Sequence, residues 1–466
     1  MSGADASFLY FETPAAHMHV LGTLVVDTTD CPSWSADDMI ALLQHRIDLL
    51  RPFRQKLALA MLRLHHPVWV DVPDIDVREH VRRVKCPAPG TMVELAQEVA
   101  AFASVQLDRS RPLWECLVVE DMTEHRAAIV FKIHHCAVDG VAAARILTAL
   151  FDVSPEGRTE AELLGAKTEA RALQQREPSV IDVAVHTVTG LATRPWHTAR
   201  VGISAVKAVT GIVGRRVGDA DTEGGALPLT APRAPFNGSI TPRRAVAYID
   251  VALDDVKAIK SAVGGTFNDA VTAITGGALR NYLLKRDELP DSSLIAVIPV
   301  STRGDETDVA ANRTSAMFTS LGTDLADPIE RLKAVRRSNQ VAKGDQAAWG
   351  PDLVARFSEI APPNTTAALA RLYSVLRFAN LHPVVHNLVL SNVAGPPFQI
   401  YMAGAKVEGI FPLGPVMEGP GLNITVVSYR DRVGFGIIAC RDRLPDIDDL
   451  AAEFPATVEE MLLAVR

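Results

Sequence analysis

The chain has 466 residues, of which 48% are hydrophobic and 22% are charged. This composition is that of a folded globular protein and excludes an intrinsically disordered chain. The length is too great for one ordinary core and favours two domains. A net charge of −8 provides no basic surface of the kind that gathers nucleic acid, so a nucleic-acid partner is not expected.

The cysteines argue against a disulfide scaffold. They are five in number, widely spaced and without a Cys-x-x-Cys pair: Cys31, Cys86, Cys116, Cys136 and Cys440. This pattern indicates a reducing compartment and disfavours a zinc ribbon. Residues 1–7 lack the basic and apolar regions of a signal peptide, and no run of about 18 apolar residues predicts a membrane-spanning helix. We therefore expect a cytoplasmic protein and leave peripheral membrane contact open.

The first 150 residues alternate between strand and helix patterns. Periodicity and capping residues predict strands at 21–26, 117–120 and 127–133, and helices at about 36–50, 93–107 and 141–151. The strand at 127–133 is apolar enough to be central in a sheet. A histidine pair therefore stands at the end of a central strand, followed by a short loop and a buried helix.

The middle of the chain has a different character. Residues 154–177 are polar, with a loop-like or weakly helical pattern. Residues 180–217 have a helical pattern with Gly and Thr breaks, and they contain one acid, Asp182, among several Arg and Lys residues. Residues 218–235 are rich in Gly, Pro and Ala, which is typical of a linker.

The second half resumes the alternation. It predicts strands at 245–251, 294–300, 388–393, 424–429 and 433–439, and helices at 253–263, 267–284, 328–341, 366–378 and 446–466. Strands mixed with helices in both halves predict an α/β sandwich built twice. We expect an N-terminal domain at 1–155, a helical connection and linker at 156–235, and a C-terminal domain at 236–466.

The segment from His134 to Gly140 carries the candidate chemistry. We expect His134 and His135 to be adjacent on a strand, so that their side chains point to opposite faces and only one can face a given cavity. A neutral imidazole is suited to remove the proton of an alcohol, and an activated acyl donor such as a thioester needs no covalent enzyme intermediate. Asp139 can fix the loop by pairing with an arginine or can orient a histidine. Gly140 leaves room for a tight turn or a ligand.

The histidine pair has three other interpretations. The pair can be structural, as histidines at a strand end often are. Two histidines and an aspartate can also ligate zinc, but adjacent strand positions diverge and no third well-spaced ligand is evident, so no metal is expected. A serine hydrolase is disfavoured because the chain lacks a Gly-x-Ser-x-Gly elbow.

The heptad His134 to Gly140 resembles the active-site motif of the coenzyme A-dependent acyltransferase superfamily. Further segments, in order along nearly the whole chain, resemble the bacterial wax ester synthase/acyl-CoA:diacylglycerol acyltransferase family. They are Asp5–Thr13, Met18–Val20, Pro112-Leu113-Trp114-Glu115, Thr266–Val271, Pro299–Arg303, Ser391–Pro396 and Gly421–Tyr429. The Asp-Phe-Gly-Trp-Gly segment of the plant branch is absent, and Ala394 stands where the family often has proline.

The resemblance implies two chloramphenicol-acetyltransferase-like halves with an active-site tunnel between them. It implies transfer of a long-chain fatty acyl group from acyl-CoA, which is a substrate and not a cofactor, to diacylglycerol or a long-chain alcohol. His135 matches the family's catalytic histidine, and His134 matches the first histidine, which is usually supporting. Asp139 matches a residue generally held structural, and Arg303 is a candidate partner for it.

Other matched residues keep two interpretations. Asn268 and Asp269 match an Asn-Asp pair near the family's site, and at a helix start they also suit a capping role. Ser391 and Asn392 can donate hydrogen bonds near the thioester or can form a turn. The apolar segment 112–114 is interpreted as core packing that supports the site.

Two alternatives to this enzyme stay open. One is a condensation-type acyltransferase that uses a carrier-protein thioester, and the other is a non-catalytic lipid-binding homologue. Residues 180–217 either lie on an anionic membrane or lipid-droplet surface or form an ordinary helical connection. The sequence does not choose between the two acceptor alcohols, and it does not set the acyl-chain length or the oligomeric state.

Overall fold

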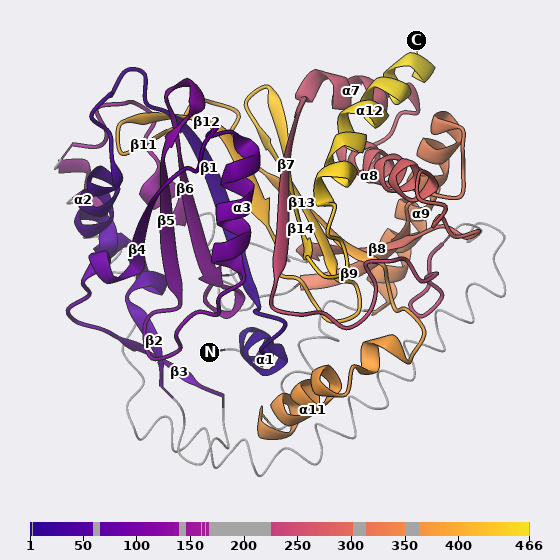
Figure 1. Cartoon of the computed structure of the whole chain (residues 1–466), viewed down its shortest axis with the longest axis horizontal. Helices are drawn as coiled ribbons and strands as arrows, with labels where there is room; N and C mark the ends of the chain where they lie inside the picture. Colours follow the sequence, from indigo (N-terminus) through magenta and orange to yellow (C-terminus); the bar gives the residue numbers. More distant parts are fainter. Residues whose placement is uncertain are drawn as a thin grey trace.

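The computed structural model describes residues 1, 3–58, 66–138, 146–159, 161–163, 165–166, 225–301, 314–349 and 363–465. Asp139, Gly140, Arg303 and the segment 180–217, each assigned a role above, lie outside the described residues. Within them, two six-stranded sheets lie side by side with helices packed on them (Figure 1). The predicted α/β architecture of two sheet-containing halves is confirmed.

The first sheet has the strand order β11-β12-β1-β6-β5-β4. Its strands are β1 (His19–Asp27), β4 (Val81–Lys85), β5 (Trp114–Met122), β6 (Arg126–His134), β11 (Tyr401–Met402) and β12 (Ala405–Leu413). Helix α2 (Ala36–Arg46) packs on one face of β6 and α3 (Met92–Ala103) packs on the other, so β6 is central and buried. A separate hairpin of β2 (Gln55–Ala58) and β3 (Val68–Asp71) lies beside this sheet.

The second sheet has the order β7-β14-β13-β10-β8-β9. Its strands are β7 (Arg244–Ala252), β8 (Ile295–Ser301), β9 (Thr314–Ser320), β10 (Leu388–Ala394), β13 (Leu422–Tyr429) and β14 (Arg432–Cys440). The helices packed with it are α7 (Leu253–Ala262), α8 (Phe267–Leu284), α9 (Pro328–Trp349) and α12 (Ile447–Val465). Two further helices, α1 (Gly3–Phe11) and α11 (Pro363–Val375), contact each other below the sheets in Figure 1.

Helix α8 forms the centre of the second core. Thr266 caps it, and Asp269 completes a capping box by accepting from the Thr266 main-chain N–H. Nearly every residue from Asp269 to Leu279 is buried. Gly276 lies in the middle of the helix, where a side chain would clash. A Cβ at this position would be 2.0 Å from the carbonyl oxygen of Leu321. The close approach of α8 to the segment after β9 therefore depends on a missing side chain.

Contacts between the halves are polar as well as apolar. Helix α3 packs against β7, and the Thr23 and Tyr248 hydroxyls lie 2.8 Å apart. The buried Arg244 joins the two halves: its guanidinium donates to the Ala15 carbonyl, and its main-chain N–H donates to Ser104 Oγ at 2.9 Å. The start of β7 is thus fastened to the loop that precedes β1.

The first sheet is not built from residues 1–155 alone. Strands β11 and β12 fall within the range 236–466, which was expected to form the C-terminal domain, yet β12 pairs with β1 along residues 406–413. The pattern of residues 405–413 was not recognised as a strand from the sequence. The second half of the chain therefore supplies an edge of the first sheet.

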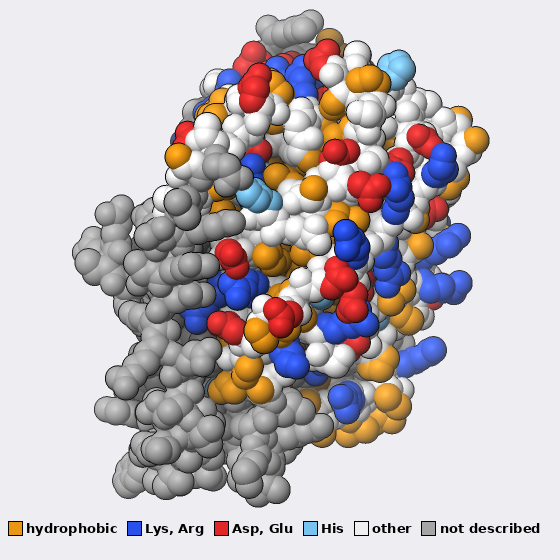
Figure 2. Space-filling model, turned by 90° about the vertical axis from the view of Figure 1, so that its left-hand side faces the viewer, with side chains coloured by type: hydrophobic (Ala, Val, Ile, Leu, Met, Phe, Trp, Pro, Cys, Tyr) orange, Lys and Arg blue, Asp and Glu red, His pale blue; other side chains and the backbone are white. Residues whose placement is uncertain are grey.

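The opposite edge of the first sheet is β4, which carries exposed basic side chains. Arg83 Nε lies 2.7 Å from Glu120 Oε2, and Lys85 Nζ lies 2.7 Å from Asp121 Oδ2. Charged side chains on an edge strand discourage pairing with another chain. Figure 2 shows acidic and basic side chains interspersed over the face on the left of Figure 1, so neither sign dominates there.

Candidate active site

The strand that carries the histidine pair ends between its two members. β6 ends at His134, and His135 begins the short 3₁₀ helix η6 (His135–Ala137). The expectation that both histidines lie on a strand was therefore wrong. The two main-chain N–H groups bond to different distant segments: that of His135 donates to the Met18 carbonyl at 2.8 Å, whereas that of His134 donates to the Leu113 carbonyl at 3.0 Å.

His134 is buried and braces the turn that follows it. Its Nδ1 accepts the main-chain N–H of Cys136 at 3.2 Å. A nitrogen that accepts carries no proton, so the neutral ring has its proton on Nε2. Nε2 lies 3.5 Å from Glu12 Oε2. The side chain of His134 is thus held between the η6 backbone and a carboxylate.

Glu12 follows α1 directly and is almost completely buried. Burial alone would raise the pKa of its carboxyl, but the His134 imidazole and the Arg109 guanidinium hold that pKa below its ordinary value. Arg109 Nε donates to Glu12 Oε2 at 2.8 Å. Glu12 is therefore ionised at neutral pH behind the histidine pair. The sequence pattern alone gives Glu12 no role, although it is the single acid among the mostly apolar residues 8–13.

The His135 ring lies against α1. Its centroid is 3.9 Å from that of the Phe8 ring, and the planes differ by 12°. Its Nδ1 is buried without a hydrogen-bond partner among the described residues. Burial lowers the pKa of the imidazole, and the residue's own main chain only partly opposes this. The ring is therefore neutral at pH 7, which is the form that accepts a proton.

The segment 112–114 is part of the core beneath this turn. The Trp114 ring lies between those of Phe53 and His80, with both centroids 4.4 Å away, and its Nε1–H donates to the Phe53 carbonyl at 2.9 Å. Pro112 and Leu113 are also buried. Through the Leu113 carbonyl, this segment supports the main chain of His134.

Asp269 is occupied by structural contacts. Its Oδ2 accepts the Thr266 N–H at 2.7 Å, and its Oδ1 accepts the Asn339 amide at 2.7 Å. Both partners belong to the second half, and no hydrogen bond between described residues joins Asp269 to His135. Asn268 is half-buried in the first turn of α8. The geometry is that of a helix cap tied to α9.

Ser391 and Asn392 lie on β10, beyond the part of that strand that pairs with β8. β10 pairs with β8 only at Leu388 and Val389, while Ser391 and Asn392 pair on the other side with β13. Ser391 is half-buried and Asn392 is exposed. No hydrogen bond between described residues links either side chain to His135.

The described residues hold neither of two other features, a metal cluster or a membrane-spanning helix. In the described ranges, no group of three or more His, Cys, Asp or Glu side chains is placed to hold a metal ion, and Asp139 lies outside them. None of the helices in the described part of the chain has the length and apolarity to cross a bilayer. All five cysteines are free thiols, and burial raises the pKa of Cys136 beside the histidine pair.

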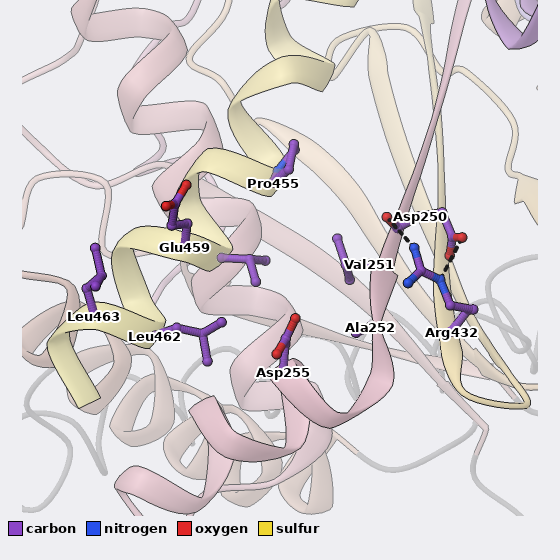
Figure 3. Close-up of a pocket in the computed structure, with 10 residues that line it drawn as sticks. Asp250, Val251, Ala252, Asp255, Arg432, Pro455, Glu459, Leu462 and Leu463 are labelled. Carbon is purple, nitrogen blue, oxygen red and sulfur yellow. Dashed lines mark hydrogen bonds and ion pairs between the residues drawn. The ribbon is translucent and has the colours of Figure 1, made fainter. Parts of the chain in front are cut away.

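A surface cavity of about 380 Å³ lies in the second half, away from the histidines. Figure 3 shows it between α12, α7 and the β7–β14 pair, where Arg432 forms an ion pair with Asp250. The other wall of the cavity is formed by α12, with Glu459, Leu462 and Leu463. None of its lining residues belongs to the histidine turn, so it is distinct from the candidate active site.

Comparisons with known proteins agree along the whole chain. Residues 1–271 match the "Wax ester synthase/diacylglycerol acyltransferase catalytic domain", and residues 310–462 match the "WS/DGAT C-terminal domain". A putative diacylglycerol O-acyltransferase of Mycobacterium tuberculosis strain H37Rv is 36% identical over 99% of this chain and 90% of its own length. Another from the same strain is 33% identical over 97% of this chain and 93% of its own length.

Two solved structures are similar to this chain over nearly its whole length. The wax ester synthase/diacylglycerol acyltransferase from Marinobacter aquaeolei VT8 is similar with a TM-score of 0.66 and 27% identity, over 99% of this chain and 98% of that one. The trichothecene 15-O-acetyltransferase from Fusarium sporotrichioides shares the fold, with a TM-score of 0.57 and 14% identity over 100% of this chain and 94% of that one. The chain therefore belongs to the wax ester synthase/diacylglycerol acyltransferase family.

Proposed function

We propose that this protein transfers a long-chain fatty acyl group from coenzyme A to diacylglycerol or a long-chain alcohol, with His135 as the general base. The observation that carries the proposal is a partly buried, neutral imidazole at the one turn where the family match and the histidine motif coincide. The product is triacylglycerol or a wax ester, and the second product is free coenzyme A.

The reaction needs one proton acceptor and no enzyme nucleophile. A neutral imidazole with its proton on Nδ1 can accept at Nε2, and the burial of Nδ1 leaves Nε2 for the substrate hydroxyl. As the proton moves to Nε2, the hydroxyl oxygen forms a bond to the thioester carbonyl carbon. The tetrahedral intermediate then breaks its C–S bond, and the coenzyme A thiolate recovers the proton from the imidazolium.

His134 and Glu12 support this base without touching the reacting atoms. His134 Nδ1 holds the Cys136 N–H, which fixes the first turn of η6 and hence the main chain of His135. Glu12 faces the opposite nitrogen of His134 at 3.5 Å and favours the tautomer that makes this contact. We therefore assign His134 and Glu12 as positioning residues.

The remaining matched residues keep narrower roles in the proposal. We assign Asp269 to the helix cap, because both of its carboxylate oxygens accept hydrogen bonds from residues of the second half. Ser391 and Asn392 remain candidate donors to the thioester, and Gly140 a candidate for substrate contact. The pairing of Asp139 with Arg303 remains a prediction, as does the tunnel between the halves.

The test is turnover by the purified full-length protein. Palmitoyl-CoA is supplied with diolein or with hexadecanol, and thiol release and ester formation are followed together. We expect equal amounts of thiol and ester with at least one alcohol, and little thiol release without an alcohol. Absence of ester with both alcohols would overturn the proposal. Ester formation from a carrier-protein thioester alone would show the condensation-type enzyme instead.

A further inference from the structure

Helix α11 turns its apolar side away from the protein. Leu369, Leu372 and Val375 are 59%, 50% and 77% exposed, at helical spacing along one face. The apolar surface continues past the helix end at Leu376, Phe378 and Leu381, which are also exposed. We call the exposed apolar side chains at positions 369, 372, 375, 376, 378 and 381 the α11 patch.

The inward side of α11 is occupied by small and polar groups. Ala367 packs against the cluster that contains Leu9, Leu113 and Cys136. Ser374 Oγ donates to Glu418 Oε1 at 2.6 Å on the same inward side. A helix that simply covers a soluble protein places its apolar stripe inward and its polar face in water. In α11 this arrangement is reversed, so the α11 patch needs a covering partner.

The charged side chains within the patch segment itself, residues 363–382, are of one sign. Arg371 and Arg377 are exposed among the apolar side chains. Residues 363–382 contain no Asp or Glu. Arginines among exposed leucines match a surface that is apolar inside and anionic at its boundary, which is the character of an anionic phospholipid layer. They match less well a second copy of this patch, because two such copies would bring like charges together.

The patch adjoins the candidate active site through α1. α1 contacts both α11 and η6, and its Phe8 ring lies on His135. Figure 1 shows α1 and α11 next to each other below the two sheets. A surface docked on α11 therefore lies one helix away from the general base.

We propose that the α11 patch docks the protein on an anionic phospholipid surface, from which the apolar acceptor alcohol is taken. The reason for docking rests on the proposed function, because a lipid alcohol resides in such a surface. The docking itself is a binding property that is measured without turnover. Its failure and the failure of the proposed function are therefore distinguishable.

The experiment is vesicle co-sedimentation of the full-length protein. The probes are vesicles of phosphatidylcholine with phosphatidylglycerol, and vesicles of phosphatidylcholine alone. We expect preferential binding to the anionic vesicles. The triple variant L369S/L372S/V375S is expected to lose at least about tenfold in binding, because inserted apolar side chains supply much of the affinity of an interfacial helix.

The matched control is V153S/L284S/L463S. These side chains are 76%, 52% and 64% exposed and lie outside α11, so the control removes similar apolar area elsewhere. It is expected to bind like the unchanged protein. Equal binding by the two triple variants would overturn the proposal, and so would an unchanged protein that binds neither kind of vesicle.

A charge variant keeps the proposal testable if the apolar triple variant fails to fold. R371E/R377E is expected to lose binding to the anionic vesicles, whereas K257E/K333E, which reverses two exposed charges on α7 and α9, is expected to keep it. Light scattering without vesicles tests whether a second copy of the protein covers the α11 patch. A dimer that disappears in L369S/L372S/V375S would show that a second copy covers the patch and would overturn lipid docking.

Turnover separates docking from chemistry. With a short-chain alcohol in solution, L369S/L372S/V375S is expected to retain the activity of the unchanged protein, because the patch is connected to the turn that carries His135 through α1, which contacts both α11 and that turn. With diolein in anionic vesicles its activity is expected to fall in proportion to binding. Equal loss of activity with both alcohols would contradict a role in docking.

Discussion

The Phe8 and His135 rings lie nearly parallel, with centroids 3.9 Å apart, although the two residues are far apart in the chain. One face of the imidazole is thereby covered by α1, and substrate must approach its edge. The same ring is partly buried and neutral, so its chemistry depends on an N-terminal helix as much as on the motif that contains it.

The first prediction concerns the base itself. His135→Ala is expected to lower kcat by about 10²–10⁴-fold, the usual contribution of a general base. The thermal midpoint is expected to change little, because no hydrogen bond between described residues links the His135 side chain to the rest of the fold. Steady-state turnover and a thermal melt measure the two effects. Near-normal kcat in a folded variant would refute the assignment of the base.

The second prediction concerns Glu12. Glu12→Gln keeps the shape of the side chain but removes the charge that faces His134 and Arg109. We expect a loss of stability of about 1–3 kcal/mol, because Arg109 loses a charged partner. We also expect a lower kcat with little change in KM, because the main chain of His135 is held less firmly.

The control for Glu12 is Glu79→Gln, which alters a carboxylate that is 59% exposed and 3.5 Å from Arg111. It is expected to change neither stability nor kcat measurably. Glu12→Asp, which restores the charge, is expected to recover part of the lost kcat. A Glu12→Gln variant in which KM changes while kcat does not would exclude the positioning role.

The third prediction is the pH dependence of turnover. The pKa of His135 is lowered by burial, and the neutral ring is the active form. Activity is therefore expected to persist as the pH falls through about 6.5, the ordinary histidine value, and to decline only below it. The measurement is kcat/KM against pH with a soluble alcohol. An acid limb centred above the ordinary value would contradict a buried neutral base.

The fourth prediction is a loss of stability in acid from His386. Burial lowers the pKa of His386 to about 4, from an ordinary value of 6.5. The unfolded chain therefore binds a proton between these values that the folded chain does not. Stability from this group is present above pH 6.5 and is lost as the pH falls towards 4. Urea unfolding of His386→Phe is expected to show a smaller loss over this range, and an unchanged slope would argue against the mechanism.

The fifth prediction tests the packing of α8. Gly276→Ala places a Cβ 2.0 Å from a carbonyl oxygen, which the backbone must move to relieve. We expect destabilisation of about 1–3 kcal/mol, as for other overpacked cores. Gly344→Ala in α9 is the control, because a Cβ there meets nothing within 4 Å. It is expected to stabilise the helix by up to about 1 kcal/mol. Equal effects in urea unfolding would refute the close-approach argument.

Much of the fold could be predicted from local patterns. The helix predicted at 267–284 is confirmed at both ends, because Thr266 and Asp269 form a capping box before a long apolar run. Strands β1, β6, β7 and β14 are confirmed as well, since each has a mostly apolar pattern. Local signals of this kind act within a few residues and can be recognised without knowledge of the fold.

Other elements could not be predicted because distant residues determine them. β12 contains Gly409 and Pro412, which interrupt a strand pattern, and its partner β1 lies at the other end of the chain. β4 is a polar edge strand with a weak apolar signal. The contact of Glu12 with His134, and the turn that separates His134 from His135, depend on the loop before β1. No spacing within the motif encodes them.

The pairing of β12 with β1 has a consequence for synthesis of the chain. A ribosome that has released the first four strands of this sheet has not yet made residues 405–413, so the outer edge of β1 stays unpaired while most of the second half is produced. An open edge of this kind invites pairing with other nascent chains. Completion of the N-terminal sheet is thus among the last events in the folding of this protein, and it joins the stability of the catalytic half to that of its partner half.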